Sequence, residues 1–279
     1  MAVTWHELTP DDLPAVSALA GRCLATDGGL PLLTDLGFLR ARFTAGETLA
    51  ASDGANLVAA AATRPALDRA LALVDPGWRG RGLGSRLLDW SLARASVVET
   101  EGLTDGAAAL FGSRGLACGF AEDVMAFDLA ATPLPEIGPP AVTPWDPALA
   151  DRFFATYEAS FRDRPGFPGW SKEDWVEDFD PRWTLLASTV DGDVGFITGE
   201  DGWIVQVGVV PAARGSGLGA ALVTEALRRM RAHGLRAAGL TVNANNPHAA
   251  ALYRRLGFTV TGRRATFTAA HPPGTAPAP

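Results

Sequence analysis

Apolar residues recur at the same spacings in the two halves of the chain and predict the same order of elements twice. From Leu218 to Met230 every fourth residue is apolar, which indicates a helix, and Gly234 follows where a helix should end. Asp-Gly pairs at 53–54 and 191–192 predict a hairpin in each half. In each half the predicted order is strand, helix, hairpin turn, strand and glycine-rich turn, followed by a helix. In the first half these elements fall at 3–8, 10–23, 53–54, 70–74 and 75–84. In the second half they fall near 142 and at 147–161, 191–192, 203–210 and 210–219. A strand at 238–242, a short helix at 247–256 and a closing strand at 258–267 complete the second half.

Individual residues repeat as well as elements. The segment 75–84, Asp-Pro-Gly-Trp-Arg-Gly-Arg-Gly-Leu-Gly, reappears at 210–219 as Val-Pro-Ala-Ala-Arg-Gly-Ser-Gly-Leu-Gly. Two weaker echoes keep the same order, pairing 48–52 with 184–188 and 108–116 with 250–258. So long a period indicates a duplicated domain and not a solenoid. We expect an α/β domain (α+β, with a mixed sheet), present twice.

The chain length agrees with two domains joined by a linker. Its 279 residues suit two domains of about 140 residues each. Four prolines between 130 and 140 exclude a helix interior or a central strand, so an extended linker is predicted there. We expect an N-terminal domain at 1–130, a linker at 131–141 and a C-terminal domain at 142–270. The proline-rich tail at 271–279 has nothing to bury and is expected to be disordered.

Composition excludes several classes of protein. A hydrophobic content of 47% with 20% charged residues is typical of a packed globular chain, and the sequence lacks an apolar run of about 18 residues that could span a bilayer. The acidic N-terminus does not resemble a signal peptide, and two distant cysteines match no zinc or haem spacing, so a cytoplasmic location is expected. The net charge of −7 argues against nucleic acid as a partner. The four histidines have no ligand spacing, so no metal is assigned.

The repeated glycine-rich turn predicts an anion site. Where the strand before Pro211 ends, glycines let successive main-chain N–H groups point into one concavity at the start of a helix, and Arg214 adds a charge at its rim. A phosphate-binding P-loop would need a lysine, and a dinucleotide fingerprint would need G-x-G-x-x-G where this turn has G-x-G-x-G. A flexible loop that caps a helix is the alternative, but the arginine and proline offsets occur twice.

Two motifs resemble signatures of the GNAT superfamily of N-acetyltransferases. The segment 214–219, Arg-Gly-Ser-Gly-Leu-Gly, resembles the acyl-CoA pyrophosphate loop R/Q-x-x-G-x-G/A of that superfamily. The segment 246–258 is similar to its later signature, N-x-x-A-x-x-L-Y-x-x-x-G-F. The resemblance covers nearly all of 142–267 and, in weaker form, 3–129. Tandem chains of the mycothiol-synthase-like type share this layout.

The resemblance implies that acetyl-CoA binds to the second copy as the acyl donor. The implied contacts are the strand backbone near Val207 and Val209, the side chain of Asn246, and the loop residues Arg214, Gly215, Ser216, Gly217, Leu218 and Gly219. The first copy keeps a matching set, which is Val74, Arg79, Gly80, Arg81, Gly82, Leu83 and Gly84. Because Phe111 stands there in place of Tyr253, and Thr104 in place of Asn246, we expect the first copy to hold an acyl-CoA without performing chemistry.

Tyr253 is the expected general acid. The resemblance implies that it sits by the thioester sulfur, and a phenol of pKa ~10 is protonated at neutral pH. The alternative is a tyrosine that only packs on an amphipathic helix. The general base stays open, because many GNAT enzymes carry a glutamate on the strand where this chain has Gln206. Glu200 and Asp201 are candidates that would act through water, or they are solvated hairpin acids.

The acceptor is expected to bind at 157–170 and the helix that follows. Trp170, Trp175 and nearby acids would favour a cationic amine, or else Trp175 faces the core and the acids are solvated. The sequence thus predicts an N-acyltransferase that acetylates a primary amine of a small molecule. A protein or peptide N-acetyltransferase and an acyl-CoA-binding module without turnover are the alternatives. A monomer is favoured, because two fused copies can form internally what other members form as dimers.

Overall fold

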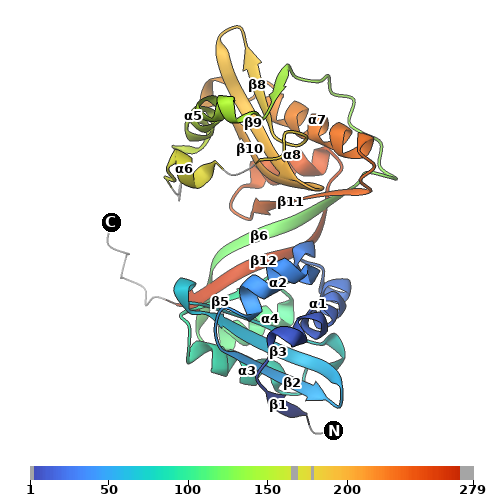
Figure 1. The fold of residues 1–279 in the computed structure, drawn as a ribbon, viewed down its shortest axis with the longest axis vertical. Helices are drawn as coiled ribbons and strands as arrows, with labels where there is room; N and C mark the ends of the chain where they lie inside the picture. The colour runs from blue at the N-terminus through green and yellow to red at the C-terminus, as the bar shows by residue number, and fades with distance from the viewer. Residues whose placement is uncertain (1–2, 165–168, 177–178, 271–279) are drawn as a thin grey trace. The chain divides into compact units, whose positions relative to one another are not determined.

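The computed structural model describes residues 3–164, 169–176 and 179–270 (Figure 1). These residues divide into two compact units. Unit 1 comprises 3–124, 243–245 and 261–270 of the described residues, and unit 2 comprises 125–242 and 246–260, apart from the segments left out. The expected tail at 271–279 lies outside the described residues.

Unit 1 is a mixed sheet with helices on both faces. Its strands follow the order β1-β2-β3-β4-β5-β12-β6, in which β4 and β5 are parallel and β1 to β4 are antiparallel neighbours. The elements are β1 (Thr4–His6), α1 (Leu13–Asp27), α2 (Leu36–Phe43), β2 (Thr48–Asp53), β3 (Asn56–Arg64), β4 (Arg69–Val74), α3 (Leu83–Leu92), β5 (Val97–Thr100), α4 (Asp105–Ser113), β6 (Leu116–Asp128) and β12 (Thr259–Ala269).

Unit 2 repeats this plan. From β11 outward its strands follow the order β11-β10-β9-β8-β7, in which β10 and β11 are parallel. The elements are β7 (Val142–Pro144), α5 (Ala150–Phe161), α6 (Lys172–Trp175), β8 (Leu185–Thr189), β9 (Gly192–Glu200), β10 (Trp203–Val209), α7 (Leu218–Ala232), β11 (Ala237–Asn243) and α8 (Pro247–Arg255). Single 3-10 turns occur at η1 (Pro10–Asp12), η2 (Pro31–Thr34), η3 (Pro65–Leu67), η4 (Pro76–Trp78), η5 (Pro147–Leu149) and η6 (Pro211–Ala213).

Strand alternation sorts the helices onto two faces of each sheet. In β3, Ala60 and Ala62 pack with α1 and α2, whereas Ala59 and Ala61 pack with Leu83 and Leu87 of α3. In unit 2, Phe196 packs with the aromatic residues of α5 and α6, and the adjacent Ile197 packs with α7. Successive side chains of a strand point to opposite faces, so each sheet is buried on both sides. The predicted fold class, a mixed α/β domain present twice, is confirmed.

Most local predictions hold. The two hairpins form where they are predicted, with loop residues 54–55 between the partners Asp53 and Asn56 and loop residues 190–191 between Thr189 and Gly192. Each loop contains one residue of its Asp-Gly pair. The helix predicted from Leu218 onward is α7, and Gly234 follows it with φ 83°. Residues 133–141 form neither helix nor strand, and Arg228 donates to the Ile137 carbonyl oxygen. This proline-rich stretch therefore has no regular secondary structure and is packed against α7.

The two units are not the two consecutive stretches that the sequence suggests. The predicted closing strand forms as β12, but its residues from 261 onward belong to unit 1, where Ala265 and Phe267 face Thr100 and Val98 of β5. In return, the end of the long strand β6 places Met125 and Phe127 in the core of unit 2. Hydrophobic periodicity predicts that a strand exists, but it does not indicate which sheet the strand joins.

Across the described part of the chain, none of the helices is both long and apolar enough to cross a bilayer.

Candidate functional site

The site in unit 2 is built around an opening between β10 and β11. Within the described part of the chain, the two parallel strands pair only at Trp203 with Gly239 and at Ile204 with Leu240. Beyond Ile204, the edge of β10 that faces β11 has no ladder partner, so its main-chain N–H and C=O groups are available to a ligand. The same strand carries a register shift against β9 between Ile204 and Gln206, which is a bulge at Val205. Sequence reasoning missed this bulge because its residues have no distinctive pattern.

The glycine turn lies at the end of β10 and the start of α7. Gly215 and Gly217 have φ of 79° and 87°, which other residues rarely adopt, and a Cβ on either would meet no protein atom within 4 Å. The turn thus leaves open space around both glycines, and it precedes a helix of 15 residues. Both properties suit a diphosphate. Ser216 closes the turn by donating from its hydroxyl to the Ala213 carbonyl oxygen at 2.7 Å.

Arg214 is positioned by two carbonyl oxygens. Its Nε donates to Val209 O at 3.2 Å and its Nη2 donates to Ser160 O at 2.9 Å. Neutral carbonyl groups fix the guanidinium without cancelling its charge. The positive charge therefore remains available to an anion at the turn.

Tyr253 lies on α8, half-buried against the core of unit 2. Its ring meets Phe258 edge-on at a centroid distance of 5.9 Å. Burial raises the pKa of Tyr253 to about 12, against a smaller opposing effect of Arg164. The phenol consequently stays protonated throughout the neutral range, which a general acid requires.

Asn246 is the N-cap of α8. Its side-chain oxygen accepts from the Ala249 N–H at 3.1 Å, and Thr104 makes the matching bond to Ala107 at the start of α4. The side-chain oxygen of Asn246 is thus bonded within the helix, while its amide nitrogen has no hydrogen-bond partner among the described residues. Val207 and Val209 lie on the face of β10 that packs towards α7.

Glu200 does not lie near the turn. It is exposed at the end of β9 and pairs with Trp203, the first residue of β10. From Trp203 to Val209 the strand extends by about 20 Å. Asp201 occupies the hairpin itself with φ 27°. The structure therefore separates both acids from the residues that surround Arg214.

Trp175 and Trp170 share one aromatic cluster but differ in exposure. Trp175 is 4% exposed, stacks on Tyr157 at 4.6 Å, and donates from its indole N–H to the side-chain oxygen of Gln206 at 3.1 Å. Trp170 is 45% exposed and lies nearly parallel to Tyr157 at 6.3 Å. Trp175 thus belongs to the core beside β10, and only Trp170 offers a ring to solvent. The sequence did not predict the contact between Trp175 and Gln206, which joins residues 31 positions apart.

The acids near this cluster are partly engaged. The main-chain N–H of Asp174 donates to the hydroxyl of the N-cap residue Ser171, and that hydroxyl donates to the Asp174 carboxylate at 2.8 Å. Lys172 pairs with Asp151 at 2.7 Å. Arg182 donates to Asp180 and holds the pKa of that carboxyl below its usual value. The acids that are expected to favour a cationic amine are thus partly bonded to other residues, and positions 177–178 lie outside the described part.

Unit 1 keeps the glycine turn and encloses a cavity of about 510 Å³ beside it. Gly80 and Gly82 have φ of 73° and 84°, close to their counterparts in unit 2. The cavity is lined by Val74, Arg79, Gly80, Gly82, Gly84, Cys23, Ser91, Glu99 and Phe111, among others. Burial raises the pKa of the Cys23 thiol to about 11, so this thiol stays protonated in the neutral range.

Three features distinguish this copy from unit 2. Arg79 donates to both carboxylate oxygens of Asp27, at 2.7 and 2.5 Å, so its charge is compensated. Strand β4 pairs with β3 without a register shift, so it lacks the bulge of β10. Phe111 is buried against Phe267 at 4.7 Å. Arg81 lies over the Trp78 ring at 4.6 Å, and Leu83 is buried at the start of α3.

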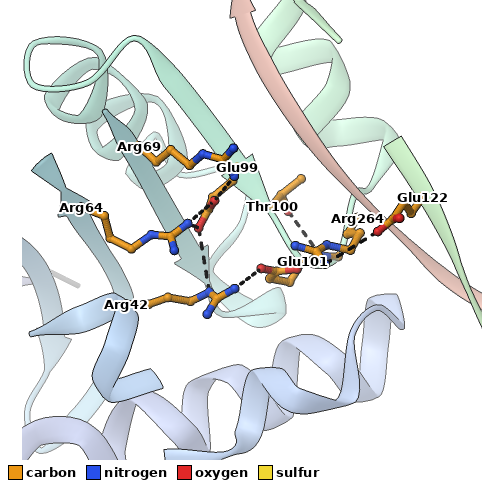
Figure 2. Close-up of polar contacts among 9 residues, drawn as sticks. Arg42, Arg64, Arg69, Glu99, Thr100, Glu101, Glu122 and Arg264 are labelled. Carbon is orange, nitrogen blue, oxygen red and sulfur yellow. Dashed lines mark hydrogen bonds and ion pairs between the residues drawn. The ribbon is translucent and has the colours of Figure 1, made fainter. Parts of the chain in front are cut away.

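A buried network of ion pairs adjoins this cavity (Figure 2). Glu99, a wall residue that is 4% exposed, accepts from Arg64 at 2.5 Å and lies 3.4 Å from Arg69. Glu101, also 4% exposed, pairs with Arg42 at 3.1 Å and with Arg264 of β12 at 2.9 Å. The matching N-caps Thr104 and Asn246 align the two copies, and in this alignment Glu99 corresponds to Thr241 and Glu101 to Asn243. Unit 2 therefore has no carboxylate at either of these matching positions.

No group of three or more histidine, cysteine or acidic side chains that could hold a metal ion occurs among the described residues.

Comparison with known proteins gives one consistent result. The acetyltransferase (GNAT) family model matches residues 147–258. A mycothiol acetyltransferase from Thermobispora bispora is 33% identical over 90% of this chain and 94% of its own length. A GCN5-related N-acetyltransferase from Sphaerobacter thermophilus superposes with a TM-score of 0.75 at 26% identity, covering 95% and 94% of the two chains.

A tandem GNAT protein from the clavulanic acid biosynthesis pathway has the same fold. It superposes with a TM-score of 0.63 at 19% identity, covering 98% of this chain and all of the other. The repeated fold, the glycine turn and these relatives lead to one assignment. The chain belongs to the GNAT acetyltransferase family, in its tandem two-domain form.

Proposed function

We propose that unit 2 transfers an acetyl group from acetyl-CoA directly to a primary amine of a small molecule. The observation that carries this proposal is the coincidence in one unit of an unpaired strand edge, an open glycine turn and a protonated phenol. Strand β10 would bind the pantetheine amides near Val207 and Val209, and the turn with Arg214 would bind the diphosphate. The mycothiol acetyltransferase relatives support a small acceptor.

The chemistry needs one acid and a neutral amine. The amine nitrogen attacks the acetyl carbonyl carbon, a C–N bond forms, and the C–S bond breaks. Tyr253 gives its proton to the departing thiolate, and the proton lost by the nitrogen returns to the phenolate through solvent. N–H groups of β10 near the bulge are suited to stabilise the oxyanion.

Unit 1 is proposed to hold an acyl-CoA without turning it over. The cavity and the two glycines with positive φ support binding there. Phe111 cannot donate a proton, and the regular ladder of β4 offers no bulge. Glu99, which could otherwise act as a base, is neutralised by two arginines.

Release of free thiol from acetyl-CoA tests the function. The purified chain is incubated with amino sugars, amino acids, polyamines and peptides, each in turn, and the acetylated product is identified by mass spectrometry. Turnover with a small amine supports the proposal. Turnover with peptides alone would make the chain a peptide acetyltransferase, and tight CoA binding without any turnover would make it a binding module.

A further inference from the structure

We infer that Gln206 positions the acceptor in unit 2, and that Trp175 holds the Gln206 amide in the orientation this requires. The inference rests on the proposed acetyl transfer by unit 2. It assigns to the reaction a residue that is neither an acid nor a base.

The orientation of the Gln206 amide follows from hydrogen-bond chemistry. The indole N–H of Trp175 can only donate, so the Gln206 atom 3.1 Å away must be the carbonyl oxygen, and the NH2 group points elsewhere. The Gln206 side chain makes no other hydrogen bond within the described residues, and the residue is half-buried. An oriented pair of N–H donors is therefore free beside β10.

Trp175 is held rigidly enough to impose this orientation. It is 4% exposed, stacks on Tyr157 at 4.6 Å with an interplanar angle of 22°, and meets Phe196 edge-on at 5.8 Å. Phe154 and Phe179 complete its surroundings at 5.9 and 5.2 Å. Aromatic contacts on several sides leave the indole little freedom to turn away.

The strand geometry places the free NH2 group beside the opening. Gln206 pairs with Thr198, two residues from Phe196, so Gln206 shares the face of β10 that α5 and α6 cover. Gly208 lies on the same face, but a side chain does not fit there, because a Cβ would lie 2.2 Å from the Phe196 ring. Gln206 follows the bulge directly and lies just past Ile204, the last β10 residue paired with β11. The donors thus stand where the unpaired strand edge begins.

The chemistry of a neutral amide limits what the acceptor can be. Its NH2 group donates, so it would bind an oxygen of the acceptor and would not attract an ammonium ion. The geometry therefore points to a primary amine that also carries a hydroxyl or carbonyl oxygen within reach of this donor. Because Gln206 cannot take a proton, the amine has to react as the free base, and its proton leaves to solvent.

A double-mutant cycle with Trp175→Phe and Gln206→Leu tests the inference. Three acceptor probes are used with acetyl-CoA: glucosamine, which has a neighbouring hydroxyl, glycinamide, which has a neighbouring carbonyl, and butylamine, which has neither. Where wild type turns over an oxygen-bearing probe, Gln206→Leu should raise the KM for that probe about tenfold and leave the KM for acetyl-CoA unchanged. Whichever of the first two probes responds identifies the oxygen. Adding Trp175→Phe to Gln206→Leu should raise the acceptor KM little further, because each substitution removes the same hydrogen bond between Trp175 and Gln206.

Two further variants separate positioning from structure. Trp183→Phe replaces another buried tryptophan, on the α7 face, and should leave the acceptor KM unchanged. Gln206→Glu keeps an acceptor for the Trp175 N–H but adds a titrating group, so the pH profile of its kcat/KM should contain one more ionisation than the wild-type profile, in addition to that of the amine.

Each outcome bears on one level of the inference. Strictly additive effects, or an unchanged acceptor KM in Gln206→Leu, would overturn it while wild-type turnover still upholds the proposed function. Equal losses for all three probes would also overturn it, since a structural role predicts no dependence on the oxygen. Absence of wild-type turnover with every amine would instead remove the proposed function, and this inference with it.

Discussion

At the residue scale, the proposed reaction distinguishes the two copies by single side chains. Tyr253 and Phe111 occupy matching positions on α8 and α4, and only the tyrosine has a proton to give. Arg214 and Arg79 both bond the carbonyl oxygen of the strand end, but only Arg79 is neutralised by a carboxylate. The sequence shows that the arginine is repeated in the two copies, but it does not indicate the partner of Arg79, since Asp27 is 52 residues away.

Tyr253→Phe should lower kcat by about 10²- to 10⁴-fold, the usual worth of a positioned acid, and leave the KM for acetyl-CoA near the wild-type value. The raised pKa of Tyr253, about 12, keeps the phenol protonated where an ordinary tyrosine ionises. Wild-type kcat should therefore show no alkaline loss from this group between pH 8 and 10. Rate measurements over that range check both statements, and unchanged turnover in Tyr253→Phe would assign the acid elsewhere.

Asp27→Asn should strengthen acyl-CoA binding in unit 1. The substitution keeps a polar side chain of the same size but frees the charge of Arg79, whose pKa is held above its usual value by Asp27. One released charge beside a diphosphate is worth roughly 1.4 kcal/mol, or about tenfold in Kd. Calorimetric titration with acetyl-CoA compares Arg214→Ala with and without Asp27→Asn. The Arg214→Ala change weakens binding in unit 2, so the binding that is measured belongs to unit 1. A weaker or unchanged Kd there would mean that the diphosphate does not approach Arg79.

At the scale of elements, the last strand of the chain stabilises the first unit. Strand β12 pairs with β5, and its Arg264 supplies a partner to the buried Glu101. In the sequence this strand reads as the end of the second copy. Its register with β5 and its ion pairs are long-range properties, so hydrophobic periodicity alone could not predict them.

Arg264→Met should destabilise unit 1 by about 3–5 kcal/mol, because a carboxylate that is 2% exposed loses a charged partner. Arg114→Met is the matched control in the same unit. Arg114 and Asp89 are 34% and 57% exposed, so losing that solvent-screened pair should leave the stability of unit 1 nearly unchanged. Urea unfolding followed by tryptophan fluorescence compares the two variants. Equal effects would show that Arg42 alone satisfies Glu101.

At the scale of the whole molecule, duplication has produced two units with the same frame and different chemistry. Both units keep the parallel strand pair and the glycine turn with positive φ at its glycines, which are features of the main chain. They differ in the bulge, in the aromatic partner of Gln206 and in the charges near the first cavity. A single substitution therefore should not convert one unit into the other.

Phe111→Tyr introduced into Tyr253→Phe should restore no turnover. The new phenol would stand in unit 1, where β4 has a regular ladder and Glu99 is held by Arg64 and Arg69. Thiol release with the best amine of the panel measures the outcome, and native mass spectrometry confirms that both variants still bind CoA. Recovery of more than a small fraction of the wild-type rate would show that Phe111 alone keeps unit 1 inactive.

The sequence by itself determined the repeat, the order of elements, the glycine turns and the candidate acid, because each depends on residues close together in the chain. Periodicity, turn chemistry and motif spacing are local, and the structure contains the elements they predict. Only the tertiary structure decided that β12 joins unit 1, that Asp27 neutralises Arg79, that Glu200 is remote from the turn and that Trp175 orients Gln206. These features depend on strand partners and side-chain contacts between distant residues, which packing selects and local pattern leaves open.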